Sequence, residues 1–404
     1  VPITGRIKVD VSGTPTDKWV AIFGGGYRAL DPDVSFDLTD HLAGVGRQVF
    51  VVDLSDGSIL SRFSETADPA GNTTGAIKDD ASDGIDNSIP APISIIGDSN
   101  NYFQYLYAGD REGHLYKMNI EGSSTPGSTL TSTQTTISSW TNCEMFDSKA
   151  TYTVDSANTS SNNLNDNKAN NRRYIYAQPE MTDDSDGNRW IFFGTGDGRN
   201  IEDLYPKIKT SGSPDADEGN IFVAIKDTTP NPSLGTAGCP ATAYTTSDFT
   251  DVTDDSTVFS TGNGWYIHLA ETEKSFTFPT VFSDTLFFTT FIPDTSDICA
   301  LGDSYLYIVN FKTGGVLTAS GGGTSALGST TLTAKKVHIG SGIATAPVIR
   351  GEKIQIGITG EATEADLQTA IDLGGKRTGS VITLGLPSGL GAETVKMKYW
   401  KEVF

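Results

Sequence analysis

Carboxylates gathered in short turns that contain glycine are the residues of this chain best placed to do chemistry. The run DDASDGID at 79–86 sets Asp79, Asp83 and Asp86 around a glycine. Hard cations such as Ca²⁺ take about six to eight oxygen ligands, often from one sharply turning loop. Because Ala81 supplies no side-chain oxygen, we predict a calcium site here with an incomplete ligand set.

A second acidic turn, TDDSDG at 182–187, ends on the pair Asp186 and Gly187 and leads into an apolar run at Trp190. An Asp-Gly pair before an apolar run is a strong signal for a tight β-hairpin turn. We therefore interpret this segment as an ordinary hairpin.

Nucleophiles and general bases show no comparable grouping. The histidines are scattered and lack the His-Glu-x-x-His spacing; they are His41, His114, His268 and His338. We expect His114 to be exposed, because it follows a turn glycine. A Ser/His/Asp triad assembles in space and stays open from sequence, but there is no Gly-x-Ser-x-Gly elbow. We assign no catalytic residue and expect a protein that is not an enzyme.

Two glycine clusters, at 24–26 and 194–196, could suggest phosphate binding. Phosphate-binding glycine loops lead into a helix whose N-terminus holds the anion, and no helical pattern follows either cluster. We predict tight turns or close packing of the chain at these positions.

The charge balance limits the partners. The chain has 50 acidic and 29 basic residues and a formal net charge of −21. Such a charge repels nucleic-acid backbones, so nucleic acid is excluded as a partner. Divalent cations or basic partners fit the charge, and so does the simple solubility of a secreted protein.

Three cysteines, Cys143, Cys239 and Cys299, lie too far apart for a zinc or haem motif. They permit at most one internal disulfide, for which we expect the pair Cys239 and Cys299. No stretch has the roughly 18 apolar residues that a membrane span requires. The chain begins at Val1, and we expect it to be a processed or trimmed part of a longer secreted precursor.

The elements that must position these residues are strands. Pairs of apolar runs joined by turns recur at intervals of roughly 40 to 60 residues, as four-stranded propeller blades require. We predict one all-β domain over residues 1–404, a β-propeller of about seven blades, with two β-sandwiches as the rival. We expect long polar loops at 64–90, 121–140 and 151–171, and one helix at 363–375, capped by Thr363 and stopped by Gly374.

Aromatic residues fall into two groups. We expect the aromatics of the apolar runs to fill the core between blades; they are Trp19, Tyr107, Trp190, Phe287 and Phe288. We expect the aromatics beside polar insertions to be candidates for contacting a partner; they are Tyr102, Phe103 and Tyr205.

The same runs resemble the PilY family of type IV pilus proteins. The resemblance lies in an ordered series: WVAIFGGGY, VFVVDL, YAGDREGHLYKMNI, QPEMTDDSDGNRWIFFGTGDGRNIEDLYP, GWYIHL, FFTTFIPDTSDICALGDSYLYIVNFKTGG, GSGIATAPVI and KYWKEVF. It implies the C-terminal β-propeller of that family, without the family's large N-terminal part. It also implies a calcium loop at 98–104, where Asp98 and Asn100 match the first two ligands. The Asp-Gly pair of that loop is absent, and Gln104 stands at the last carboxylate position.

The function that the resemblance implies is non-catalytic. The chain would sit at the pilus tip on the cell surface, contact minor pilins, support pilus assembly and the balance of extension and retraction, and attach to host or abiotic surfaces. Two alternatives stay open: a secreted propeller enzyme, such as a quinoprotein-like dehydrogenase with its cofactor in the central funnel, and a glycan-binding adhesin that acts alone.

Overall fold

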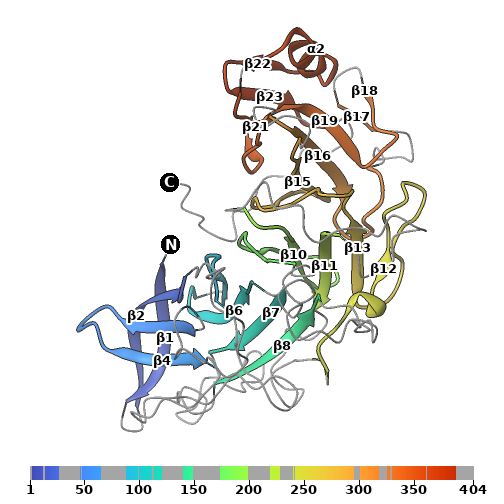
Figure 1. Ribbon diagram of the computed structural model, residues 1–404. Helices are drawn as coiled ribbons and strands as arrows, with labels where there is room; N and C mark the ends of the chain where they lie inside the picture. Colours follow the sequence, from blue (N-terminus) through green and yellow to red (C-terminus); the bar gives the residue numbers. More distant parts are fainter. Residues whose placement is uncertain are drawn as a thin grey trace, which may run out of the picture.

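The chain folds into a series of small antiparallel sheets that follow one another along a curved path (Figure 1). The computed structural model describes residues 2–11, 14–26, 46, 48–64, 88–98, 100–111, 113–120, 140–148, 173–198, 219–227, 240, 242–294, 301–317, 325–327, 330–360 and 362–387. Five sheets of four or five strands and one two-stranded sheet form within these residues. The predicted propeller-like all-β fold is confirmed; the described residues form five blade-like sheets where the whole chain was expected to have about seven.

The first two sheets are simple meanders, because strands that follow one another in the chain are also neighbours in the sheet. The first sheet contains β1 (Ile3–Val11), β2 (Thr14–Gly24), β3 (Gln48–Asp53) and β4 (Ile59–Ser64). The second sheet contains β5 (Ser94–Gly97), β6 (Phe103–Gly109), β7 (His114–Asn119) and β8 (Thr141–Asp147).

The third and fourth sheets form the middle of the series. The third contains β9 (Glu180–Asp183), β10 (Arg189–Gly194), β11 (Ile221–Asp227), β13 (Gly264–His268) and the short parallel strand β12 (Thr250–Asp251), which follows a 3-10 turn, η3 (Thr246–Asp248). The fourth contains β14 (Thr280–Phe282), β15 (Thr285–Ile292), β16 (Asp303–Asn310) and β19 (Lys336–Ser341). A two-stranded sheet, β17 (Ala326–Leu327) and β18 (Thr330–Thr331), lies between β16 and β19 in the sequence.

The fifth sheet carries the predicted helix. It contains β20 (Val348–Arg350), β21 (Lys353–Gly357), β22 (Lys376–Thr378) and β23 (Val381–Gly385), and α2 (Glu364–Asp372) lies between β21 and β22 in the chain. Thr363 caps α2 as predicted: its hydroxyl accepts from the Asp366 amide, and the Asp366 carboxylate accepts from Thr363. The apolar face is displaced from the prediction, because Ala370 is buried while Leu367 and Ile371 are exposed.

The hydrophobic core is divided into four clusters, one between each successive pair of the five sheets. Strands in the middle of the series are therefore covered on both faces, and β7 and β10 are buried at every position. In the cluster between the third and fourth sheets, Phe222 and Phe288 stack with ring centroids 3.7 Å apart. Packing of each sheet against its neighbours is the arrangement by which propeller blades bury their apolar faces.

Glycines at the end of the second strand of their sheets allow successive sheets to approach closely. A Cβ on Gly24 would lie 2.5 Å from Ile89, one on Gly109 would lie 2.2 Å from Ile175, and one on Gly194 would lie 2.3 Å from Ser275. In each case the contacted residue belongs to the segment that leads into the next sheet. The sequence-based expectation of close packing at the glycine clusters is thus supported at Gly24 and Gly194.

One sequence-based expectation about the aromatic side chains is wrong. Trp19 is 59% exposed, because it lies on the outward face of β2, whereas Tyr107, Trp190, Phe287 and Phe288 are buried as predicted. Cys143 is disulfide-bonded. The predicted pair, Cys239 and Cys299, lies outside the described residues.

Candidate functional site

A β-bulge in the second sheet brings two carboxylates to the same face. In the pairing of β7 with β8, His114 lies opposite Asp147 and Leu115 opposite Phe146, but Tyr116 lies opposite Glu144. Met145 is therefore an extra residue in β8. In a regular strand, residues three apart point to opposite faces, and one extra residue reverses this relationship. The bulge thus places Glu144 and Asp147 together, beside His114.

Asp110 holds the loop that presents His114. Its Oδ1 accepts the backbone N–H groups of Gly113 at 2.8 Å and His114 at 2.9 Å. Its Oδ2 lies 3.0 Å from Nδ1 of His114 and accepts from the Tyr116 hydroxyl at 3.1 Å. Asp110 is fully buried, so these contacts fix both the turn and the orientation of the imidazole ring.

The other ring nitrogen of His114 points to the two carboxylates of β8. Nε2 lies 3.4 Å from Oδ1 of Asp147 and 3.9 Å from Oε1 of Glu144. The exposed fractions of the side chains are 8% for His114, 12% for Glu144 and 28% for Asp147. We call His114, Glu144 and Asp147 the histidine cluster; it lies just below the surface and is most open at Asp147.

The electrostatics of the cluster favour a positive charge at its centre. Burial favours the neutral imidazole, but the charge and hydrogen bond of Asp110 outweigh burial and raise the pKa of His114 well above its usual value. Asp147 and Glu144 act in the same direction. His114 is thus a buried histidine among three carboxylates, and the expectation that it is exposed is wrong.

The candidate calcium residues Asp98 and Asn100 lie in a tight turn between β5 and β6. Oδ1 of Asp98 accepts the backbone N–H groups of Asn100 at 2.9 Å and Tyr102 at 2.8 Å, so this carboxylate closes the turn. The backbone carbonyl of Asn100 accepts from Arg6. Calcium binding at this turn stays a prediction, as does binding at Asp79, Asp83 and Asp86, which lie outside the described residues.

The segment at 182–187 is the hairpin turn that the sequence predicts. Asp184 accepts the backbone N–H groups of Asp186 and Asn188, both at 2.9 Å, and the Trp190 indole N–H at 3.0 Å. These hydrogen bonds, with burial opposing them, lower the pKa of Asp184. Gly187 has a φ of 82°, which a turn of this kind requires. The carboxylate of Asp184 therefore has a structural role.

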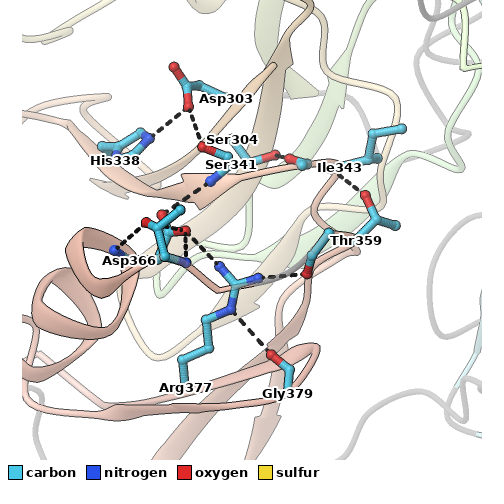
Figure 2. Close-up of polar contacts among 12 residues, drawn as sticks. Asp303, Ser304, His338, Ser341, Ile343, Thr359, Asp366, Arg377 and Gly379 are labelled. Carbon is cyan, nitrogen blue, oxygen red and sulfur yellow. Dashed lines mark hydrogen bonds and ion pairs between the residues drawn. The ribbon is translucent and has the colours of Figure 1, made fainter. Parts of the chain in front are cut away.

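A serine, a histidine and an aspartate also meet in the fourth sheet, but without the arrangement of a catalytic triad (Figure 2). Nε2 of His338 lies 3.1 Å from Oδ1 of Asp303, and the Ser341 hydroxyl donates to that same oxygen at 3.2 Å. A nucleophilic serine needs a hydrogen bond to the base itself. Here both groups instead contact one carboxylate oxygen.

Sequence reasoning missed the histidine cluster for a specific reason. The sequence from Asp110 to His114 has the pattern of an ordinary hairpin turn, and the two carboxylates of β8 form no recognisable motif. A signal existed in the local sequence, since Asp110 and His114 are separated by the spacing of a turn whose aspartate accepts backbone N–H groups. No sequence pattern predicted the bulge at Met145.

Comparisons with known proteins give two different likenesses. Residues 44–198 match the model of glycosyl hydrolase family 62, which is less than half of the chain. The crystal structure of the C-terminal domain of PilY1 from Pseudomonas aeruginosa is similar with a TM-score of 0.51 and 14% sequence identity, over 88% of this chain and 70% of that domain. No curated protein matches the chain. The second likeness shows a shared fold.

The expectation that the chain is not an enzyme is overturned by the first likeness. Residues 44–198 match a family of glycosyl hydrolases, and they include β3 to β10 and the whole histidine cluster. As for membranes, no helix within the described residues is long and apolar enough to span a bilayer.

Proposed function

We propose that this chain is a secreted β-propeller that acts on glycans as a glycoside hydrolase. The match of residues 44–198 to glycosyl hydrolase family 62 carries the proposal. The matched segment contains the one group of described residues in which partly exposed carboxylates meet a histidine within 4.8 Å. We place the contact with the glycan at this cluster, because carboxylate oxygens accept hydrogen bonds from sugar hydroxyls.

Other carboxylates in the matched segment have structural partners. Asp53 is buried and binds Lys18, and Asp98 and Asp184 accept backbone N–H groups in their turns. Glu144 and Asp147 lie together on one face of β8 beside His114, with exposed fractions of 12% and 28%. One oxygen of each carboxylate lies within 4.8 Å of the other, and glycoside hydrolysis uses a pair of carboxyl groups that flank the scissile bond.

The test measures sugar release from a panel of aryl glycosides and plant and bacterial polysaccharides. We expect hydrolysis of at least one glycosidic substrate by the 404-residue chain, and a loss of at least about tenfold in kcat/KM for Glu144→Gln with Asp147→Asn. The matched control is Asp303→Asn, which changes a half-exposed carboxylate outside the matched residues and should leave the rate unchanged. Absence of hydrolysis on the whole panel by folded protein would refute the proposal.

A pilus location is a second proposal, supported by the likeness of fold to the PilY1 C-terminal domain over 88% of the chain. We propose that the propeller is displayed at a type IV pilus tip, where it would contact minor pilins and a host or abiotic surface. A glycan-directed activity is compatible with this location, because such surfaces carry sugars. Affinity capture from sheared native pili tests it: recovery of minor pilins supports the location, and their absence counts against it.

A further inference from the structure

The donor atoms of the histidine cluster converge as metal ligands do. Among the described residues, His114, Glu144 and Asp147 are the group of three metal-binding side chains whose donor atoms all lie within 4.8 Å of one another. A tetrahedral zinc site with bonds of about 2.0–2.2 Å holds its ligand atoms about 3.3–3.6 Å apart. The two distances from Nε2 of His114, 3.4 and 3.9 Å, are close to that spacing. We propose that the histidine cluster binds a divalent transition-metal cation of the zinc class.

The surroundings of the imidazole match those of a histidine that binds a metal. Such a histidine usually presents its other ring nitrogen to a carboxylate, which fixes the tautomer and the ring orientation. Here Oδ2 of Asp110 lies 3.0 Å from Nδ1 of His114, and Nε2 faces Glu144 and Asp147. Because Asp110 is itself fixed by two backbone N–H groups, the ring is oriented before any cation arrives.

The donor set selects the class of cation. Imidazole nitrogen is a preferred ligand of zinc and its neighbours, whereas calcium and magnesium prefer oxygen ligands alone. One imidazole with two carboxylates leaves a fourth position open for water or a substrate oxygen, as in catalytic zinc sites. The most exposed member of the cluster, Asp147, lies on the side from which a cation would enter.

The charge of the cluster also favours a cation. Three carboxylates, those of Asp110, Glu144 and Asp147, surround the imidazole of His114. A divalent cation placed between Nε2 and the carboxylates of Glu144 and Asp147 would be held by their negative charge.

This site deepens the proposed function, because a cation with an open position would hold a glycan hydroxyl. Cation binding itself does not depend on hydrolysis, so the two can fail separately. Hydrolysis by protein that binds no Zn²⁺ in the titration would leave the glycan proposal standing and overturn the metal site. Zn²⁺ binding by protein that hydrolyses nothing on the panel would overturn the glycan proposal and leave the metal site standing.

The experiment is calorimetric titration of the chelator-treated 404-residue chain with Zn²⁺, together with visible absorption on titration with Co²⁺. We expect one site per chain and a Co²⁺ absorption band of a low-coordinate complex with mixed nitrogen and oxygen ligands. Glu144→Gln and Asp147→Asn should each weaken Zn²⁺ binding by at least about tenfold. His338→Gln is the matched control, since His338 also contacts an aspartate but lies outside the histidine cluster.

Thermal unfolding of each variant separates loss of the site from loss of the fold. Glu144→Gln and Asp147→Asn are made separately, each in a partly exposed side chain. If one of the two variants folds, its Zn²⁺ affinity can be compared with that of the wild type. Either of two results would overturn the proposal: folded wild-type protein that gives no Zn²⁺ heat and no Co²⁺ band, or folded Glu144→Gln and Asp147→Asn variants that bind as tightly as the wild type.

Discussion

Nζ of Lys117 lies 2.6 Å from Oδ2 of Asp227, and each side chain is only 1% exposed. Lys117 belongs to β7 of the second sheet and Asp227 to β11 of the third, so the ion pair joins two neighbouring blades. The Tyr107 hydroxyl donates to the same carboxylate oxygen at 3.1 Å. Burial lowers the pKa of Lys117, although Asp227 opposes that shift. The pair therefore fixes how the second and third sheets pack.

Replacing one member of this pair is expected to destabilise the fold strongly. Lys117→Met leaves the Asp227 carboxylate buried without its ammonium partner, at a cost of about 3–5 kcal/mol. Urea unfolding, followed by tryptophan fluorescence, measures this change. The double variant Lys117→Met with Asp227→Leu should be more stable than the sum of the single changes predicts, because neither charge remains buried. Simple additivity of the two changes would contradict this account.

The stability of the first sheet should depend on pH through Asp53. Burial alone would raise the pKa of Asp53, but hydrogen bonds from Lys18 and Ser55 lower it from 3.8 to about 2. The pKa of Asp53 is lower in the folded state than in the unfolded state. The ionised carboxylate therefore stabilises the fold fully above about pH 4, and this stabilisation is lost as the pH falls towards 2. The shift corresponds to about 2 kcal/mol.

Comparison with Asp53→Asn isolates this contribution from those of other carboxylates. The difference in the free energy of unfolding between wild type and Asp53→Asn should be largest near pH 6 and should shrink by about 2 kcal/mol between pH 4 and pH 2. A difference that stays constant down to pH 2 would show that the ion pair with Lys18 does not stabilise the ionised form.

The N-terminal cap of α2 offers a local test of helix stability. Thr363→Ala removes the hydroxyl that accepts from the Asp366 amide at 3.1 Å and should cost about 1 kcal/mol. Thr363→Ser keeps an equivalent oxygen and should cost much less. Hydrogen exchange of the α2 amides gives a direct measurement, and equal protection in the two variants would exclude a capping role.

The close approach of the third sheet to the segment before the fourth should not tolerate a side chain at Gly194. A Cβ there would lie 2.3 Å from the Ser275 hydroxyl and 2.9 Å from its carbonyl oxygen. Gly194→Ala should therefore destabilise the fold by about 1–3 kcal/mol through overpacking. Gly385→Ala is the control, because the nearest atom to its Cβ is 3.9 Å away. Similar melting temperatures for both variants would count against this packing.

Much of the fold follows from local sequence patterns. Alternating apolar residues and Asp-Gly turns predict the hairpins, and Thr363 with a glycine stop predicts α2, because strand alternation and helix capping depend on residues close in the chain. The same local logic identifies the turn at Asp184. The formal net charge of −21 follows from the composition alone.

The histidine cluster was decided by tertiary structure alone. Asp110 and His114 are close in sequence, but Glu144 joins them across a sheet and shares a face with Asp147 only because of the bulge at Met145. The exposure of Trp19 was likewise set by the face of β2 on which its side chain lies. Sequence patterns specify which segments become strands, but the register between strands and the packing between sheets determine which side chains meet, because those contacts join residues far apart in the chain.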